Sequence, residues 1–295
     1  HRKNRYSSYI ADIEKGLVAK RERAVRLLND SLCPSPELLC SMLDNESNKL
    51  RLWERSYEDG DFLAIRMGLG NRPFEVKLKI PKQGFQLYED ELRNLPAELS
   101  KKYGILSNVP LTIDIRTNHT IGVIGSQKNI RTILYETILN IISLHSYDEV
   151  KLVLVTSPKQ AHVFDDFKNV PHIWSNDKKI RFFSTNPDEV HFIFNIIDET
   201  IKEREGAEGR DNPIVPHFVV IVTEPHLIEK EALLRYMNDA DNQVGITTIF
   251  AYGDVTKLPK SCKTIIQSDD TRSGYYIKHK NTNRFISFAV DSIET

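Results

Sequence analysis

The sequence predicts an α/β protein with a mainly parallel sheet flanked by helices and an N-terminal helical segment. Continuous apolar runs predict buried strands, and the clearest run is 217–222. The strand 120–124 leads into a helix at 130–142, whose apolar residues recur every three or four positions. Buried strands that alternate with helices are typical of parallel sheets covered on both faces.

An N-terminal helix is predicted by apolar residues at 4-3 spacing, with Lys20 at one position of the stripe and charges on the other faces. The stripe consists of Tyr6, Ile10, Ile13, Leu17, Ala24 and Leu27. It fits a short coiled-coil-like stalk and, equally, an amphipathic helix packed on its own domain. Ser35 and Pro36 then predict the start of a second helix, with Leu38, Leu39, Met42 and Leu43 on its apolar face.

The other expected elements follow from alternation, apolar runs and turn residues. Asn186 and Glu189 form the capping pattern of a helix start, with Pro187 at the first helical position. The expected strands are 62–67, 74–80, 111–115, 151–155, 180–184, 245–251 and 264–267, the expected helices are 89–103, 187–201 and 227–237, and 275–277 with 285–289 form a hairpin.

Composition bounds the function. The 295 residues are 40% hydrophobic and 27% charged, which is typical of a globular chain of one large or two ordinary domains. The net charge is −1, so the chain lacks the excess of basic residues that is typical of nucleic-acid-binding proteins. Cys33, Cys40 and Cys262 lack metal-ligand spacing and are expected to be reduced thiols. The chain begins at His1 and has no apolar run of about 20 residues, so we expect a fragment whose membrane anchor, if present, lies outside it.

The segment after strand 120–124 is the candidate phosphate site. A strand, a loop and a helix are the setting of the P-loop G-x-x-x-x-G-K-[ST]. Gly122 and Lys128 match that pattern, whereas Gln127 replaces the second Gly and Asn129 replaces Ser/Thr. Gln brings a side chain into the space of the phosphate, and Asn is a poor substitute for the hydroxyl that binds magnesium. The candidate loop residues are Gly122, Gly125, Ser126, Gln127, Lys128 and Asn129.

The acidic strand end of a working site is also altered. The apolar strand 217–222 is followed by Thr223 where Asp is needed, while Glu224 stands where a catalytic Glu would lie. Both magnesium contacts from the protein are therefore predicted to be lost. From these residues alone, a vestigial P-loop and an ordinary strand-to-helix turn remain equal alternatives.

Several ordered motifs resemble the EssC/EccC/YukB family, the FtsK/SpoIIIE-type ATPases of type VII (ESX) secretion. The motifs are Leu52-Trp53-Glu54-Arg55, the segment 61–70 (DFLAIRMGLG), the strand 109–114 (VPLTID), the turn 122–125 (GVIG), His145-Ser146-Tyr147-Asp148 and 171–175 (PHIWS). They extend from Leu52 to about Cys262. From the residues alone, Trp53 is expected in the core, Glu54 and Arg55 in a surface ion pair, and His145 and His172 in structural hydrogen bonds. A subunit-contact role for the first motif stays open.

The resemblance implies a P-loop-ATPase-like (FtsK/RecA-like) fold that lies between the transmembrane helices and the first ATPase module. It implies a membrane-proximal stalk at 1–49 and a degenerate ATPase-like domain at 50–295, on the cytoplasmic side of the bacterial membrane. We expect no catalytic residue, metal or cofactor here, and ATP with magnesium in downstream modules. The expected partners are the adjacent module, other secretion components and further copies in the full-length assembly, but not nucleic acid.

Two rival functions remain. In the first, the domain still binds ATP weakly or hydrolyses it slowly through Lys128 and Glu224. In the second, it is a DNA translocase module like FtsK and SpoIIIE, against which the near-neutral charge argues.

Overall fold

The computed structural model describes residues 2–44, 49–74, 76, 91–206, 214–278 and 284–291. The chain forms two compact units, one of His1–Pro34 with Leu69–Leu111 and the other of Ser35–Gly68 with Thr112–Thr295. It passes between them after Pro34 and within strands β1 (Ala64–Pro73) and β2 (Ile105–Asp114). The predicted division into a stalk (1–49) and an ATPase-like domain (50–295) concerns function and stays a prediction.

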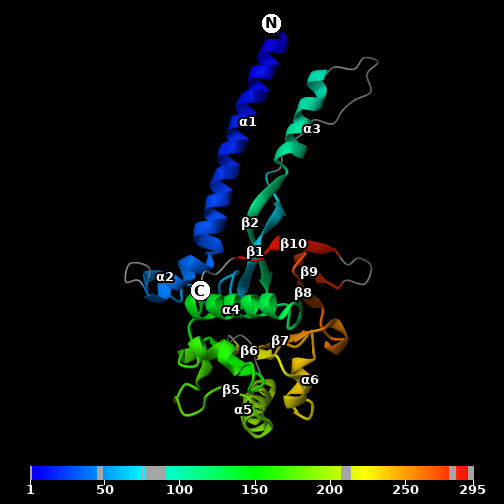
Figure 1. The fold of residues 1–295 in the computed structure, drawn as a ribbon. Coiled ribbons are helices and arrows are strands. Elements are labelled where there is room, and N and C mark those ends of the chain that lie inside the picture. The colour runs from blue at the N-terminus through cyan, green and yellow to red at the C-terminus, as the bar shows by residue number, and fades with distance from the viewer. Residues whose placement is uncertain are drawn as a thin grey trace. The chain divides into compact units, whose positions relative to one another are not determined.

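In the first unit, helices α1 (Arg2–Leu27) and α3 (Glu91–Tyr103) run alongside each other (Figure 1). The Glu14 carboxylate accepts hydrogen bonds from Lys102 Nζ at 2.8 Å and Tyr103 Oη at 2.7 Å. These bonds, the one from Lys102 first, lower the pKa of Glu14. Helix α1 thus packs against α3 within its own unit, which fits both a coiled-coil-like stalk and an amphipathic helix packed on its own domain.

The end of α1 corrects one predicted contact. The helix continues as a π-helical turn over Leu28–Leu32, where Cys33 N–H donates to Leu28 O at 2.9 Å. Leu27, predicted on the apolar stripe, is 47% exposed, and Leu28 is buried instead against Leu106 and Val109. A straight α-helix drifts from a stripe of 3.5-residue repeat by about 20° per seven residues, so after three such repeats the next residue along faces inward.

The sheet order is β2-β1-β10-β9-β8-β3-β7-β6-β4-β5. The pairings from β8 to β5 are parallel, whereas β9 pairs antiparallel with both β8 and β10. The strands β3 and β6 are separated by β7 alone, which confirms their predicted central and near-adjacent positions. The bounds are β3 (Thr120–Gly125), β4 (Val150–Val155), β5 (Phe183–Ser184), β6 (His217–Val222), β7 (Ile246–Gly253), β8 (Thr264–Ser268), β9 (Ser273–Ile277) and β10 (Phe285–Ala289).

Helix α4 (Gln127–Leu144) lies at the centre of the second unit. It packs against β3 and β7 and also against α2 (Pro36–Asp44), and its side chains from Glu136 to Leu144 are all buried. Helix α5 (Pro187–Gly206) begins as predicted, since Asn186 Oδ1 accepts the Glu189 N–H at 3.0 Å. No helix in the described part of the chain is long and apolar enough to span a membrane.

Two predicted elements are shorter than expected. The strand 180–184 is reduced to β5, because the N–H of Ser175 donates to Ile180 O and the N–H of Phe182 donates to Ile173 O. The first part of that run thus pairs with the segment that precedes it.

The prediction of a helix over 227–237 is also wrong. The N–H groups of Ile228, Glu231 and Leu234 bond three residues back, so a tight 3₁₀ turn and successive bends precede the short α6 (Leu234–Met237).

Several strand bounds also differ. The predicted strand 62–67 begins later, as β1, because Leu63 has a φ of +58° and so lies outside the strand region. The predicted strand 111–115 is part of the longer β2. The strand 74–80 lies largely outside the described residues, and so does the start of the helix 89–103.

A buried ion pair joins β1 to the segment after β10. Arg66 Nε lies 2.7 Å from Asp291 Oδ2 and Arg66 Nη2 lies 2.9 Å from Oδ1, with side chains only 4% and 9% exposed. Glu136 is buried nearby. Burial, with Asp291 as the next cause, raises its pKa to about 9. Glu136 is therefore protonated at neutral pH, and the Arg66–Asp291 pair keeps a balanced charge.

Candidate functional site

The predicted phosphate loop is strand for most of its length. Gly122 pairs with Ile265 and Gly125 with Ser268, both in the parallel ladder between β3 and β8. Helix α4 starts at Gln127, so Ser126 alone connects strand and helix. In a P-loop these residues leave the strand and wrap around the phosphate. The geometry here favours the strand-to-helix turn, one of the two alternatives from the sequence.

The two glycines have structural reasons of their own. A Cβ on Gly122 would meet the Cδ1 of Leu258, so this glycine makes room for a packed side chain. Gly125 has a φ of +132°, and a Cβ there would clash with the carbonyl oxygen of Ser268. Both glycines thus have a reason in the protein's own packing, and it is the stricter one at Gly125.

The polar residues of the turn bind neighbouring backbone. The Ser126 hydroxyl accepts the Asn129 N–H at 3.4 Å and so caps α4, while the Ser126 N–H donates to Ser268 O at 3.0 Å. The Asn129 side-chain amide donates to Asp269 O at 3.1 Å. Ser126 and Asn129 therefore attach the start of α4 to the end of β8.

Gln127 lies over the end of β7, the strand between β3 and β6. A Cβ added to Gly253, the last residue of β7, would be 3.4 Å from Gln127 Nε2. Gln160 Nε2 donates to Gln127 Oε1 at 3.5 Å. Lys128 is exposed, so it and the first turn of α4 are the features that still favour an anion.

The predicted acidic strand end is also engaged within the protein. Thr223 Oγ1 donates to Thr156 Oγ1 at 2.8 Å, which joins the ends of β6 and β4. Glu224 lies 2.9 Å from His226 Nε2 in an exposed contact. The fold thus brings Gln127 and Thr223 to the same edge of the sheet, as expected of the strand order. The residues there do not fit a magnesium–nucleotide complex, because Thr223 supplies a hydroxyl already bonded to Thr156 and the Gln127 side chain lies at the end of β7 beside Gly253.

Three of the sequence motifs meet in a second place. The Trp53 ring lies 5.3 Å from the Tyr147 ring and 6.3 Å from the His172 ring, edge to face in both pairs. Trp53 Nε1 donates to the carbonyl of Ile142 in α4 at 3.0 Å. Edge-to-face rings add about 0.5–1.5 kcal/mol beyond the area they bury. We call Trp53, Tyr147 and His172 the aromatic cluster.

The polar residues of these motifs are structural, as predicted for the histidines. His145 Nε2 accepts the Leu63 N–H at 2.9 Å, and His172 Nε2 donates to His145 O at 2.8 Å. The predicted Glu54–Arg55 pair is wrong: Glu54 pairs with Arg51, and the buried Arg55 pairs with Asp61 at 3.1 Å. Arg55 also donates to the carbonyl oxygens of Asp61, in the turn before β1, and of Ala64, the first residue of β1.

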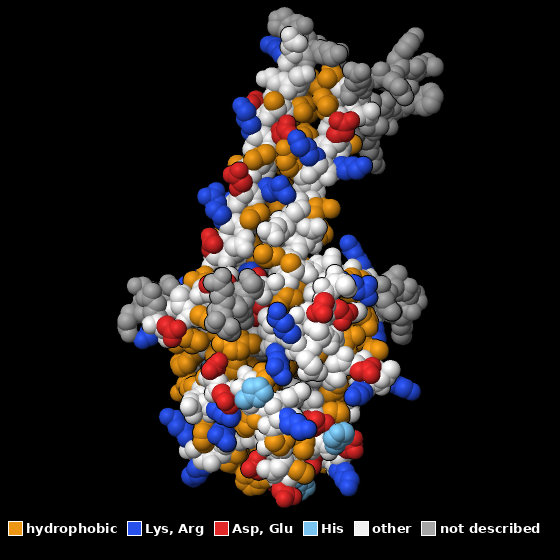
Figure 2. All heavy atoms as spheres, in the orientation of Figure 1, with side chains coloured by type: hydrophobic (Ala, Val, Ile, Leu, Met, Phe, Trp, Pro, Cys, Tyr) orange, Lys and Arg blue, Asp and Glu red, His pale blue; other side chains and the backbone are white. Residues whose placement is uncertain are grey.

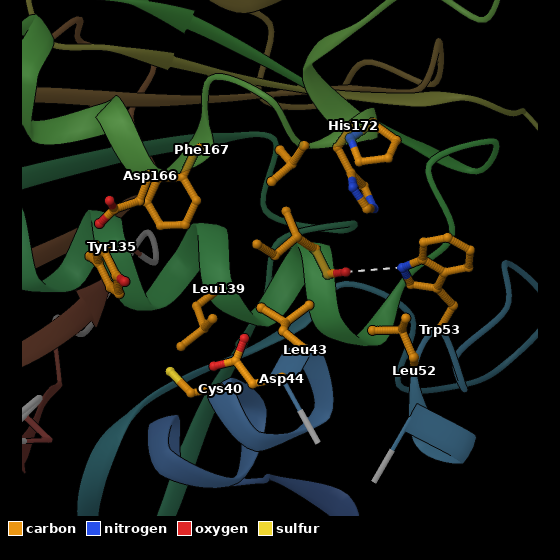
Figure 3. Close-up of a pocket in the computed structure, with 13 residues that line it drawn as sticks. Cys40, Leu43, Asp44, Leu52, Trp53, Tyr135, Leu139, Asp166, Phe167 and His172 are labelled. Atoms are coloured by element: carbon orange, nitrogen blue, oxygen red, sulfur yellow. Dashed lines mark hydrogen bonds between the residues drawn. The ribbon is translucent and has the colours of Figure 1, made fainter. Parts of the chain in front are cut away.

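A cavity of about 370 Å³ adjoins the aromatic cluster, between α2, α4 and the segment 161–173 (Figure 3). Apolar side chains form most of its lining: Leu43, Leu52, Trp53, Leu139, Phe167 and Val170. Two carboxylates, Asp44 and Asp166, also line it. Sequence reasoning missed this cavity, because its residues come from distant segments and each reads as an ordinary core or surface position.

The buried histidines predict acid sensitivity. Burial, the largest cause, lowers the pKa of His145 to about 3 and that of His172 to about 4. Because these values lie below the ~6.5 of an unfolded chain, the unfolded state binds protons more readily below pH ~6.5. Each histidine then lowers the free energy of unfolding by about 1.4 kcal/mol per pH unit, down to its folded pKa.

The variant His172→Gln keeps an amide donor for His145 O and removes one of these contributions. Between pH 6.5 and 5.0 we expect its free energy of unfolding to fall by about 2 kcal/mol less than that of the parent chain. Urea unfolding at both pH values measures the difference. The same pH dependence in both chains would show that His172 is not held neutral.

No family model matches the chain. Curated relatives do match it, and three of them illustrate the likeness. ESX secretion system protein EccC of Geobacillus thermodenitrificans (strain NG80-2) is 26% identical over 296 residues, which cover 100% of this chain and 20% of that protein. ESX secretion system protein YukB of Bacillus subtilis (strain 168) is 22% identical over 288 residues, 97% of this chain and 19% of that protein. Type VII secretion system protein EssC of Staphylococcus aureus (strain NCTC 8325 / PS 47) is 27% identical over 256 residues, 84% of this chain and 17% of that protein.

Among solved structures, the cytoplasmic domain of the Thermomonospora curvata type VII secretion ATPase EccC gives a TM-score of 0.48 at 11% identity, over 81% of this chain and 27% of that one.

The parallel sheet, with α4 directly after β3, has the architecture of P-loop-type α/β proteins. Within that class the chain is a homologue of the type VII secretion proteins EccC, YukB and EssC, which confirms the resemblance seen in the sequence. The chain spans about a fifth of the length of these relatives.

Proposed function

We propose that the chain is a non-hydrolysing, structural and regulatory ATPase-like domain of a membrane-bound type VII secretion motor. In this role it couples the membrane channel to downstream ATPase modules and lies on the cytoplasmic side of the cell membrane. Its partners are the adjacent ATPase module and other components of the secretion machine. Homology with EccC, YukB and EssC supports the secretion role.

The single-residue connection between β3 and α4 carries the non-hydrolysing part of the proposal. A phosphate-binding loop needs free backbone N–H groups that converge on the phosphate. Here residues 122–125 pair with β8, and the Ser126 N–H donates to Ser268 O. Those groups hold the sheet together, so they are not available for a ligand.

We expect the chain to bind ATP with magnesium no more tightly than about 1 mM, roughly −4 kcal/mol. Lys128 contributes one exposed charge. Its contribution to the free energy of ATP binding is too small to offset the missing phosphate loop and the missing magnesium ligands. Calorimetry with ATP and magnesium measures this. Beside the parent chain we would use the triple variant Gln127→Gly, Asn129→Thr and Thr223→Asp, which restores the motif residues.

The variant separates two explanations. The strand geometry predicts no binding in either chain, since the substitutions do not release residues 122–125 from β3. Binding by the variant alone would mean that the chain can still form a P-loop, and that only the motif residues at 127, 129 and 223 had been lost. Micromolar binding by the parent chain would contradict the proposal and favour the weakly hydrolysing rival.

The DNA-translocase rival gains no support from the face drawn in Figure 2. Figure 2 shows Lys and Arg side chains interspersed with Asp and Glu on the face drawn, with no continuous basic stripe. Proteins that follow a nucleic-acid backbone present a positive groove and strongly salt-dependent binding. Filter binding of DNA at low salt is expected to show no retention above that of a neutral control protein.

A further inference from the structure

The cavity beside the aromatic cluster has the composition of a docking site. We call it the α2–α4 groove, defined by the six apolar residues named above together with Asp44 and Asp166. Its volume of about 370 Å³ lies within the ~300–1,000 Å³ typical of ligand pockets. Leu43 and Trp53 at the groove are 37% and 38% exposed. Large apolar side chains that gather around a cavity, rather than scatter singly, mark an interaction surface.

Two carboxylates give the groove negative charge, and its described lining residues include no Lys or Arg. Asp44 and Asp166 are both exposed, and neither has an ion-pair partner in the described part of the chain. Burial first, and then the charges of nearby groups that include Asp166 and Asp44, raise the pKa of the lining residue Tyr135. Figure 3 shows Asp166 beside Phe167 and Asp44 beside Cys40 and Leu43. Among the described lining residues there is no Lys or Arg, and burial keeps the pKa of His172 at about 4, so that His172 is neutral at physiological pH.

The floor of the groove is rigid. Leu139 and Ile142 belong to the buried face of α4, and Trp53 is fixed to that helix by its hydrogen bond to Ile142 O. Trp53 is oriented further by its contacts with Tyr147 and His172. A preformed site of this kind loses little conformational entropy when a partner binds.

We propose that the α2–α4 groove docks a partner segment with a large apolar side chain next to an Arg or Lys. The apolar side chain fills the space over Leu139 and Phe167, and the cation pairs with Asp44 and Asp166. An acidic segment is excluded, since it would bring like charges together at the groove. This docking is independent of the proposed lack of ATP turnover, because no residue of the groove belongs to the β3–α4 turn.

Selection from a displayed library of random octapeptides on the purified chain tests the proposal. A Trp174→Phe background leaves Trp53 as the only tryptophan, because the chain has two. We expect an enriched consensus with a large apolar residue adjacent to Arg or Lys. The synthetic consensus peptide should shift Trp53 emission, and replacement of its basic residue by Glu should weaken its Kd at least about tenfold.

The double variant Asp44→Asn, Asp166→Asn should bind the consensus peptide more weakly, with a Kd raised by a similar factor. It removes both carboxylates without changing the apolar lining. The control Glu199→Gln, Glu203→Gln makes the same change of net charge on exposed positions of α5 and should bind like the parent. No consensus, a consensus without a basic residue, or equal binding by the two double variants would overturn the proposal. If the groove instead holds a second copy of this chain, light scattering would show a dimer that the Asp44/Asp166 variant disrupts, which would equally overturn it.

Discussion

Replacing Arg66 by Met is expected to lower the free energy of unfolding by about 3–5 kcal/mol. The guanidinium makes two short contacts with Asp291, and both side chains are nearly inaccessible to water. Without Arg66, the Asp291 carboxylate would remain buried beside Glu136, whose Oε1 has no partner among the described residues. Urea unfolding at pH 7 measures the loss.

Two further variants make this result specific. Lys263 and Asp241 also form a close pair, at 2.6 Å, but their side chains are 48% and 82% exposed. Lys263→Met should therefore change the free energy of unfolding by no more than about 1 kcal/mol. The double variant Arg66→Met, Asp291→Leu also removes the unpaired carboxylate. It should therefore recover part of the free energy of unfolding that Arg66→Met loses. Equal effects of Arg66→Met and Lys263→Met would contradict the buried-pair argument.

Replacing Gly125 by Ala is expected to cost about 3 kcal/mol or more, even without any nucleotide present. The backbone φ of +132° is unfavourable for any residue with a Cβ, and the added methyl group would meet the carbonyl oxygen of Ser268. That oxygen cannot move aside, because it accepts the Ser126 N–H and lies in the β8 ladder. Thermal or urea unfolding of the variant measures the cost.

Gly122→Ala is the matched control at the other motif glycine. Its added Cβ would meet the end of the Leu258 side chain, which can rotate away, so a cost of about 1 kcal/mol is expected. The order of the two effects is the informative result. Equal costs for the two substitutions, or a larger cost for Gly122→Ala, would contradict the packing argument.

The sheet was largely predictable because its strands are short, continuous and apolar. The run 217–222 is buried at every position, and burial on both faces leaves an unbroken hydrophobic pattern in the sequence. The helix start at Asn186 was predictable for a local reason, since capping depends on residues three positions apart. Local signals of this kind survive in a single sequence.

The errors came from tertiary contacts. Apolar residues at 180–182 suggested a sheet strand, but their backbone groups bond to 173–175, a pairing that no propensity reveals. The segment 227–237 has helix-forming residues, yet Ile228 and Leu233 are buried in a tighter turn. At the candidate site, the residues that replace the P-loop consensus were readable from the sequence. The contacts that explain the two glycines, with Leu258 at Gly122 and with Ser268 of β8 at Gly125, were not.

The α2–α4 groove could not have been predicted, because its lining joins residues more than 120 positions apart, from Cys40 to His172. The motifs around Trp53, Tyr147 and His172 were visible only as separate resemblances. Their contact with one another is a property of the folded chain.

The position of β10 in the sheet has a consequence for how the chain acquires its structure. Strand β10, near the end of the sequence, lies between β9 and β1, and its neighbour Asp291 pairs with Arg66 across 225 positions. Contacts of such long sequence separation form late and slow the folding of a domain. During synthesis, the edge of β1 that pairs with β10 therefore stays unpaired until residues 285–289 have left the ribosome. Unpaired edges in incomplete chains promote aggregation, so shortening the chain before residue 285 is expected to convert a folded product into an aggregating one.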